Sequence, residues 1–232
     1  MSKPLTTTRH GSVLLVSIDD GKANALSTDL IEAIRRAVAD AESDSSTAAL
    51  VIAGRDGVFS GGFDLTVMRS GDRAAIMNLV AEGGELVRIL YGASLPIVAA
   101  CTGHAVAAGA LMLLGCDVRI GADGPFKLGL NEVAIGMVLP DWAETIAADR
   151  LARPLYHRSV FNARLVDPAE SVTAGFLDEV VPPGDVIERA LGEAATLSGL
   201  DRAAYRGSIE RFRSRVLERM AGQISADRSA LA

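Results

Sequence analysis

Residues 128–140 read LGLNEVAIGMVLP and contain one acid, Glu132, in a stretch that is otherwise almost wholly apolar. A buried carboxylate is costly unless a partner pairs with it or a reaction uses it. Burial also raises the pKa of a carboxyl group, which suits a group that takes up a proton and returns it. Glu132 is therefore a candidate general acid–base. The alternative, compatible with the first, is a helix start that Asn131 caps and whose dipole favours Glu132.

Two segments rich in glycine and alanine could supply a second kind of group. They are VFSGGFDL (58–65) and TGHAVAAGALMLLGCD (102–117). Taken singly, the first is explained as a plain strand-to-helix turn and the second as a small-residue helix packed on a sheet. Taken together, each could direct one main-chain N–H at a single oxygen and form an oxyanion hole. One such donor contributes roughly 3–4 kcal/mol to transition-state stabilisation.

The elements that must position these groups alternate between short β-rich runs and longer helical runs, as in an α/β domain. We expect a helix after Ser27, which can act as its cap, a second helix over about 72–91, and helices from about 184 onward. The predicted strands cover 12–19, 48–54, 95–101, 117–122 and 175–181.

Composition and short motifs exclude several classes of protein. The chain has 232 residues, a net charge of −6 and 49% hydrophobic residues. These values indicate a folded domain and no electrostatic footprint for nucleic acid. No apolar run approaches the roughly 20 residues that span a bilayer, so no membrane partner is expected. Cys101 and Cys116 lack metal or redox spacing, and we expect no metal, buried reduced thiols and a cytoplasmic location. Nucleotide-binding glycine motifs and a Gly-x-Ser-x-Gly elbow are absent, which argues against nucleotide binding and a serine hydrolase despite Ser60 and His104.

The sequence resembles the crotonase (enoyl-CoA hydratase/isomerase) superfamily. The resemblance lies in five segments in order: KANALS, VFSGGFDL, GHAVAAGALMLLGCDVRIGA, FKLGLNEVAIGMVLP and ARLVDPAESVTAGFLDEVVP. It covers about residues 12–185 and implies a spiral of ββα units (the ClpP/crotonase fold) with a C-terminal helical region. The predicted division is a core over 1–185 and a helical tail over 186–232 that serves trimerisation and caps the active site.

The resemblance also implies roles for single residues. The two oxyanion donors would be the main-chain amides of Phe63 and Ala108, and Glu132 would be the acid–base. The chain has Ala-Ala-Gly where many relatives have three glycines, which keeps the amide but narrows the space beside it. The path of an acyl-CoA thioester, a substrate and not a cofactor, would be lined by Ala23, Ala25, Ser60, Gly62, Asp64, Leu65, Ala107, Leu111 and Leu139.

The number of acids separates the reactions that the family performs. Its hydratases use two glutamates, and the place of the first is occupied here by Leu111. A single base next to a thioester suits a 1,3 shift of a double bond, which needs no water. The resemblance is therefore closest to single-glutamate Δ3,Δ2-enoyl-CoA isomerases. A hydratase, another acyl-CoA lyase or hydrolase of the same fold, and a non-catalytic acyl-CoA-binding protein remain as alternatives.

Other residues receive structural roles as their first interpretation. His104 is expected to be packed or solvent-facing, and Asp64 and Asp117 to cap or brace turns. Trp142 and Met137 either shape the acyl pocket or belong to the core. By resemblance we expect a homotrimer or a dimer of trimers, in which tail arginines of one subunit could reach the CoA phosphates of another.

Overall fold

The large β-sheet is the frame on which the other elements are placed. The structure is a computed structural model that describes residues 4–229. In it, β1 is antiparallel to β2, and every other neighbouring pair is parallel. The strands lie in the order β1 (Leu5–His10), β2 (Val13–Ile18), β3 (Ala49–Ala53), β5 (Ile97–Cys101), β7 (Val118–Ala122) and β9 (Glu179–Val181).

A second sheet of three parallel strands grows out of the first. It consists of β4 (Gly57–Ser60), β6 (Gly103–Val106) and β8 (Leu128–Gly129). Each of these strands directly follows a strand of the large sheet along the chain: β4 follows β3, β6 follows β5, and β8 follows β7. The chain thus passes repeatedly from the large sheet to the small one, as the predicted spiral of ββα units requires. Sequence analysis did not identify β1 or the short strands β4, β6 and β8.

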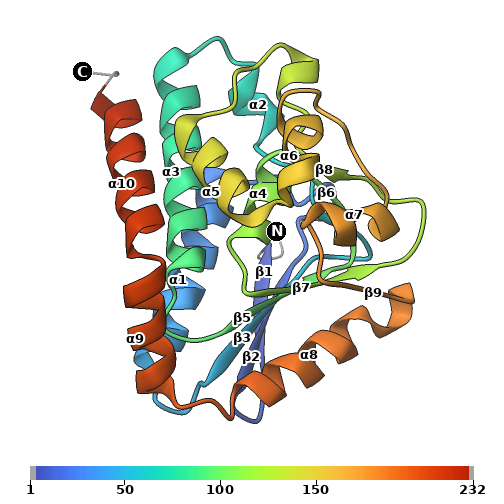
Figure 1. The fold of residues 1–232 in the computed structure, drawn as a ribbon, viewed down its shortest axis with the longest axis vertical. Helices are drawn as coiled ribbons and strands as arrows, with labels where there is room; N and C mark the ends of the chain where they lie inside the picture. Colours follow the sequence, from blue (N-terminus) through green and yellow to red (C-terminus); the bar gives the residue numbers. More distant parts are fainter. Residues whose placement is uncertain (1–3, 230–232) are drawn as a thin grey trace.

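Helices cover both faces of the large sheet because its strands are apolar on both sides. On β3, Leu50 and Ile52 face the core that holds α1 (Thr28–Ser43), α3 (Arg73–Tyr91) and α4 (Ala108–Leu114). The alternate residues Ala49, Val51 and Ala53 face α8 (Val186–Leu197) on the other side. Figure 1 shows α8 crossing one face of the sheet, well separated from α1 and α3. The predicted boundary at residue 185 falls directly before α8, and α8 itself packs on the sheet.

The remaining helices enclose the small sheet and end the chain. They are α2 (Leu65–Met68), α5 (Asp141–Arg150), α6 (Arg153–Val160), α7 (Pro168–Ala174), α9 (Arg202–Phe212) and α10 (Ser214–Ser229), with 3₁₀ turns at Val133–Ile135 and Pro183–Asp185. Helix α10 packs along α3 and α5 of the same chain (Figure 1). No helix within residues 4–229 has both the length and the apolar character needed to cross a membrane.

The two helices expected after Ser27 and over about 72–91 each begin at a side chain that caps the helix. The Ser27 hydroxyl accepts a hydrogen bond from the Leu30 amide at 3.2 Å and begins α1. Asp72 accepts one from the Ala75 amide at 3.0 Å and begins α3. Both side chains satisfy an amide that has no partner within its own helix.

Candidate active site

The first glycine-rich turn leaves one main-chain amide free. Leu26 donates a hydrogen bond to the Gly62 carbonyl (2.8 Å), and Asp64 donates one to the Leu26 carbonyl (3.2 Å). This bridge uses the peptide groups on either side of Phe63, so the Phe63 N–H points away from Leu26. Within residues 4–229 that N–H has no hydrogen-bond acceptor. Phe63 therefore carries an unpaired donor at the end of β4.

The second turn leaves another amide free. Helix α4 starts at Ala108, and the first amides of a helix have no acceptor within it. The Ala107 amide donates to the Gly129 carbonyl at 2.9 Å, whereas the Ala108 amide finds no acceptor in the described chain. Ala107 itself has φ 53° and ψ −127°, a conformation that costs a non-glycine residue about 1–3 kcal/mol.

The two turns lie in contact. A Cβ added to Gly62 would lie 3.1 Å from Cβ of Ala107 and 3.4 Å from the amide nitrogen of Ala108. Gly62 also has φ +96°, which favours glycine. A Cβ at Gly109 would overlap with the main chain of Ser60, so this glycine lets α4 approach the end of β4. The structure thus brings the amides of Phe63 and Ala108 to neighbouring positions.

These turns form one wall of a cavity of about 260 Å³, which we call the inner cavity. Its lining is mostly apolar and draws on α2, α3, α4, α5 and the 3₁₀ turn after Glu132. The lining residues are Gly61, Phe63, Leu65, Met68, Arg69, Val80, Ala107, Leu111, Asn131, Glu132, Ile135, Met137, Pro140 and Trp142.

Glu132 lies in the wall of this cavity and is 8% exposed. Its Oε2 atom is buried and has no hydrogen-bond partner within the described residues. Burial is the main cause that raises the pKa of its carboxyl group. The expected cap by Asn131 is wrong, because its side-chain oxygen accepts no hydrogen bond at the 3₁₀ turn Val133–Ile135. Leu111, which is 1% exposed, lines the same cavity.

A neighbouring groove of about 410 Å³, which we call the outer groove, shares Gly61, Phe63 and Leu65 with the inner cavity. Ala23, Ala25 and Asp64 line it, as do Lys22 and Thr66. Most of the predicted site residues therefore line two adjacent spaces, whereas Ser60, Gly62, Ala108 and Leu139 line neither. A cavity of about 620 Å³ between β1 and α1 is larger but contains none of them.

Ser60 and Gly62 lie behind the wall and support it. The Ser60 hydroxyl donates to the Asn24 carbonyl (2.8 Å) and accepts from the Gly62 amide (3.3 Å). Leu139 is half-buried and packs against the core, whereas its neighbours Met137 and Pro140 line the inner cavity.

The other polar residues considered from the sequence have structural contacts. The His104 ring accepts a hydrogen bond from the Lys127 amide at 3.0 Å and packs edge-on against Phe126. Asp64 caps α2 by accepting from the Thr66 amide. Asp117 accepts from the Ile97 amide and from the guanidinium of Arg213 on the tail.

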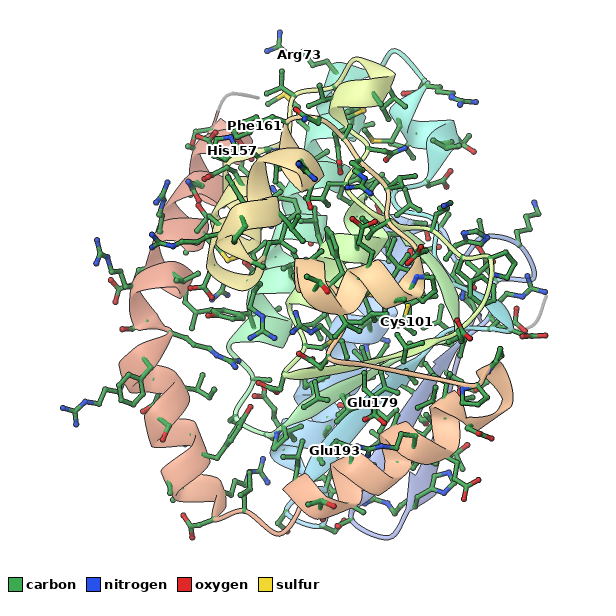
Figure 2. The ribbon with its side chains drawn as sticks, turned by 45° about the vertical axis from the view of Figure 1, so that its right-hand side comes forward. Arg73, Cys101, His157, Phe161, Glu179 and Glu193 are labelled. Atoms are coloured by element: carbon green, nitrogen blue, oxygen red, sulfur yellow. The ribbon has the colours of Figure 1, made fainter. Side chains whose placement is uncertain are left out.

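The two cysteines are free thiols that cannot reach solvent. Cys101, labelled in Figure 2, and Cys116 are both buried, and burial raises the pKa of each thiol to about 12. Neither thiol lies in the wall of the inner cavity or the outer groove.

Sequence analysis missed Asn24, which holds the loop beside the outer groove. Its side-chain amide donates to the carbonyls of Ile18 (3.0 Å) and Phe59 (3.2 Å), and its oxygen accepts from the Asp20 amide (3.0 Å). Asn24 is fully buried and has φ 48°. Asparagine in a loop favours a positive φ, which is a signal that the sequence contains. The carbonyls that its side chain contacts are remote in sequence, so only the tertiary structure identifies them.

Comparisons with known proteins agree with this arrangement. The profile described as enoyl-CoA hydratase/isomerase matches residues 8–232. The human protein named enoyl-CoA delta isomerase 1, mitochondrial, is 30% identical over 217 residues, which are 93% of this chain and 72% of that protein. The alignments cover 62% and 63% of the mouse and rat proteins of the same name.

Relatives with hydratase names occur as well. A putative enoyl-CoA hydratase of Thermus thermophilus is 30% identical over 78% of this chain and 72% of its own length. Among solved structures, a Mycobacterium tuberculosis protein superposes with a TM-score of 0.93 at 36% identity; one structure of it is titled an enoyl-CoA isomerase and covers 99% of both chains, and another is titled a probable enoyl-CoA hydratase. The fold and site thus define a crotonase-fold protein, and the chain belongs to the enoyl-CoA hydratase/isomerase family.

Proposed function

We propose that the protein is an acyl-CoA isomerase that converts a 3-enoyl-CoA to the 2-enoyl-CoA. The observation that carries the proposal is that the mostly apolar wall of the inner cavity contains a single carboxylate. Glu132 is the only carboxylate among the described residues that line it, and Leu111 lies in the wall where resemblance places the other acid of the hydratases. The raised pKa of Glu132 supports a role in which the group both accepts and donates a proton.

In the proposed reaction Glu132 removes a proton from C2 of the thioester. The electron pair of the broken C–H bond forms an enolate, and the negative charge on its oxygen is stabilised by the amides of Phe63 and Ala108. The electrons then shift so that C2 and C3 become doubly bonded, and Glu132 returns its proton to C4. No water, redox cofactor or second acid takes part. The base contributes about 10²–10⁴-fold, and each oxyanion donor roughly 3–4 kcal/mol.

The outer groove supports a CoA ester as the substrate. It connects the surface loop at Ala23 and Ala25 with Phe63, so a thioester could reach the two amides with its CoA part outside. The acyl chain would then occupy the apolar inner cavity between Val80, Met137 and Trp142. Coenzyme A is in this proposal part of the substrate. A homotrimer or a dimer of trimers, and a cytoplasmic location, remain predictions.

Two substrates separate the isomerase from a hydratase. We expect 3-enoyl-CoA to be converted to 2-enoyl-CoA, and 2-enoyl-CoA to take up water at least about 100-fold more slowly, as loss of one acid–base group predicts. Product analysis by chromatography measures both rates. Hydration at a rate similar to isomerisation would contradict the one-base mechanism, and no turnover of either ester would favour an acyl-CoA-binding protein.

Replacing Glu132 by Gln tests its role directly. Glutamine keeps the size of the side chain but cannot take up a proton at C2, so kcat should fall by about 10²–10⁴-fold. Affinity for a saturated acyl-CoA, measured by calorimetry, should change little. Glu188→Gln, at an exposed position on α8, is the matched control and should keep full activity. A Glu132→Gln enzyme with more than a tenth of the parent kcat would exclude Glu132 as the base.

A further inference from the structure

Two adjacent glycines, Gly83 and Gly84, occupy the middle of α3, and both are buried. Each glycine in a helix interior costs about 1 kcal/mol relative to alanine, so a pair requires a packing reason. By contrast, a Cβ at Gly222, in the middle of α10, would meet nothing within 4 Å.

The reason for the pair is two aromatic rings. A Cβ at Gly83 would overlap with Cε1 and Cζ of Phe63. A Cβ at Gly84 would lie 2.8 Å from Cε2 and 2.9 Å from Nε1 of Trp142. Real Cβ atoms essentially never approach so closely, so both rings lie directly on the bare backbone of α3. Both aromatic residues also line the inner cavity.

The ring of Phe63 belongs to the residue whose amide is the proposed oxyanion donor. The main chain at Phe63 is held on one side by the hydrogen bonds of Leu26 with Gly62 and Asp64. Gly62 packs against Ala107. Contact of the ring with Gly83 provides a further constraint, from a helix that is remote in sequence. An amide held by packing from several directions keeps its geometry, and oxyanion stabilisation depends on that geometry.

From these contacts we infer that Gly83 is a positioning residue. Because Gly83 has no side chain, the Phe63 ring packs directly on the α3 backbone, and this contact fixes the Phe63 amide beside that of Ala108. Gly84 has a different role, since Trp142 packs against it and shapes the acyl end of the inner cavity. The inference rests on the proposed function for its kinetic consequence. Two neighbouring glycines should therefore give different kinetic defects when each is changed to alanine.

The test compares Gly83→Ala, Gly84→Ala and the control Gly222→Ala. In Gly83→Ala the new methyl group displaces the Phe63 ring, so kcat for 3-enoyl-CoA should fall about 10- to 100-fold, below the loss for complete removal of a donor. In Gly84→Ala the KM for the acyl chain should rise several-fold with a smaller change in kcat. Gly222→Ala should match the parent. Equal kcat in Gly83→Ala and the parent, or the same defect in both adjacent variants, would overturn the inference.

A binding measurement tests the inference without turnover. The parent should bind hexanoyl-CoA more tightly than S-hexyl-CoA, a thioether that has no carbonyl oxygen for the amides. This preference should be lost in Gly83→Ala and kept in Gly84→Ala, by calorimetry. If the parent prefers hexanoyl-CoA but does not isomerise 3-enoyl-CoA, the proposed reaction is wrong. The loss of the preference in Gly83→Ala then still tests the positioning role. A preference retained in Gly83→Ala would contradict that role.

A double variant covers the case in which Gly83→Ala folds poorly. In Gly83→Ala/Phe63→Leu the smaller leucine leaves room for the new methyl group and keeps the main-chain amide. We expect it to unfold at higher urea concentration than Gly83→Ala and to regain at least part of the thioester preference. If the loss of stability in the double variant equals the sum of the losses in Gly83→Ala and Phe63→Leu, Gly83 does not act through the Phe63 ring.

Discussion

At the scale of single residues, the proposed chemistry depends on where one carboxyl group lies. Glu132 is buried beside apolar side chains, and this burial raises the pKa of its carboxyl group. The neighbouring Asn131 oxygen is also buried without a partner in residues 4–229. Main-chain hydrogen bonds of Asn131 and Glu132 act against the rise in pKa, but burial outweighs them. A group held in this way is poorly stable as an anion and a stronger base than an exposed glutamate.

The pH dependence of kcat/KM follows from this raised pKa. In the proposed reaction Glu132 must be deprotonated to accept the C2 proton, so kcat/KM should rise with pH and level off above the pKa in the free enzyme. The midpoint should lie above 4.5, the ordinary value for glutamate. Initial rates between pH 4 and 8, with circular dichroism to confirm folding at each pH, measure it. A midpoint at or below the ordinary value would contradict the burial argument.

The same shift predicts a stability effect with a definite sign. A carboxyl group with a raised pKa in the folded state binds more protons folded than unfolded, so its contribution to the free energy of unfolding falls as pH rises through that pKa. Glu132→Gln removes this dependence. We expect the variant to be more stable than the parent at pH 7 and the difference to shrink below the ordinary glutamate pKa, measured by urea unfolding at several pH values.

At the scale of elements, the site depends on contact between two turns that are remote in sequence. The turn after β4 and the start of α4 meet at Gly62 and Ala107, where both residues have positive φ. A side chain at Gly62 would separate the two amides. Ala107 already occupies a strained conformation at this contact, and such strain is found where a surrounding structure enforces it.

Gly62→Ala should therefore lower both stability and activity. Its Cβ would press on Ala107 and on the Val106 carbonyl (3.1 Å each), in addition to the strain of positive φ. We expect kcat to fall about 10²-fold or more, since a proposed oxyanion donor is displaced. Gly11→Ala is the matched control, with φ +61° and nothing within 4 Å. It should lose only about 1–2 kcal/mol of stability and keep its kcat. Equal kinetic effects in both variants would show that backbone strain alone is responsible.

At the scale of the whole molecule, a partly buried polar cluster attaches the tail helices to the core. The Arg213 guanidinium donates to Asp117 and to the Tyr91 carbonyl at 2.8 Å each, and lies 4.4 Å from the centre of the Tyr91 ring. Tyr205 donates to Asp117 at 2.9 Å. Helix α10 thereby packs on α3 and α5, which carry Gly83 and Trp142. The tail supports the inner cavity from behind within one chain.

Arg213→Ala should destabilise the fold by about 1–3 kcal/mol, because it leaves the partly buried Asp117 carboxylate without its ion pair, although the Ile97 amide and the Tyr205 hydroxyl still donate to it. Urea unfolding followed by tryptophan fluorescence measures it, since Trp142 lies in the α5 wall. Arg206→Ala removes the exposed pair with Glu210 and should cost at most about 0.5 kcal/mol. A loss below about 1 kcal/mol in Arg213→Ala would mean that apolar packing alone holds the tail.

Aromatic side chains and ion-paired acids lie at opposite ends of the molecule. His157 on α6 and Phe161 directly after this helix lie at the end opposite Glu179 and Glu193, which pair with Arg189 (Figure 2). Phe161 is 53% exposed in the single chain. The expected homotrimer or dimer of trimers is checked by light scattering, which should give three or six times the mass of one chain.

The amino-acid sequence by itself determined the elements with a strong local pattern and the types of residue that could react. Strands such as β3 and β5, the helices capped by Ser27 and Asp72, and the isolated acid Glu132 follow from the order of apolar and polar residues within a few turns of chain. The resemblance added the family, which the matching profile confirms.

Only the tertiary structure decided how these parts meet. The short strands β4, β6 and β8 are stabilised by partners remote in sequence, so they leave little local signal. The contact of Gly62 with Ala107, the burial of Glu132 beside Leu111 and the seat of Phe63 on Gly83 each join distant segments. Distances, burial and pKa arise from packing of the whole chain, because the free energy of a group depends on its surroundings in space and not on its neighbours in sequence.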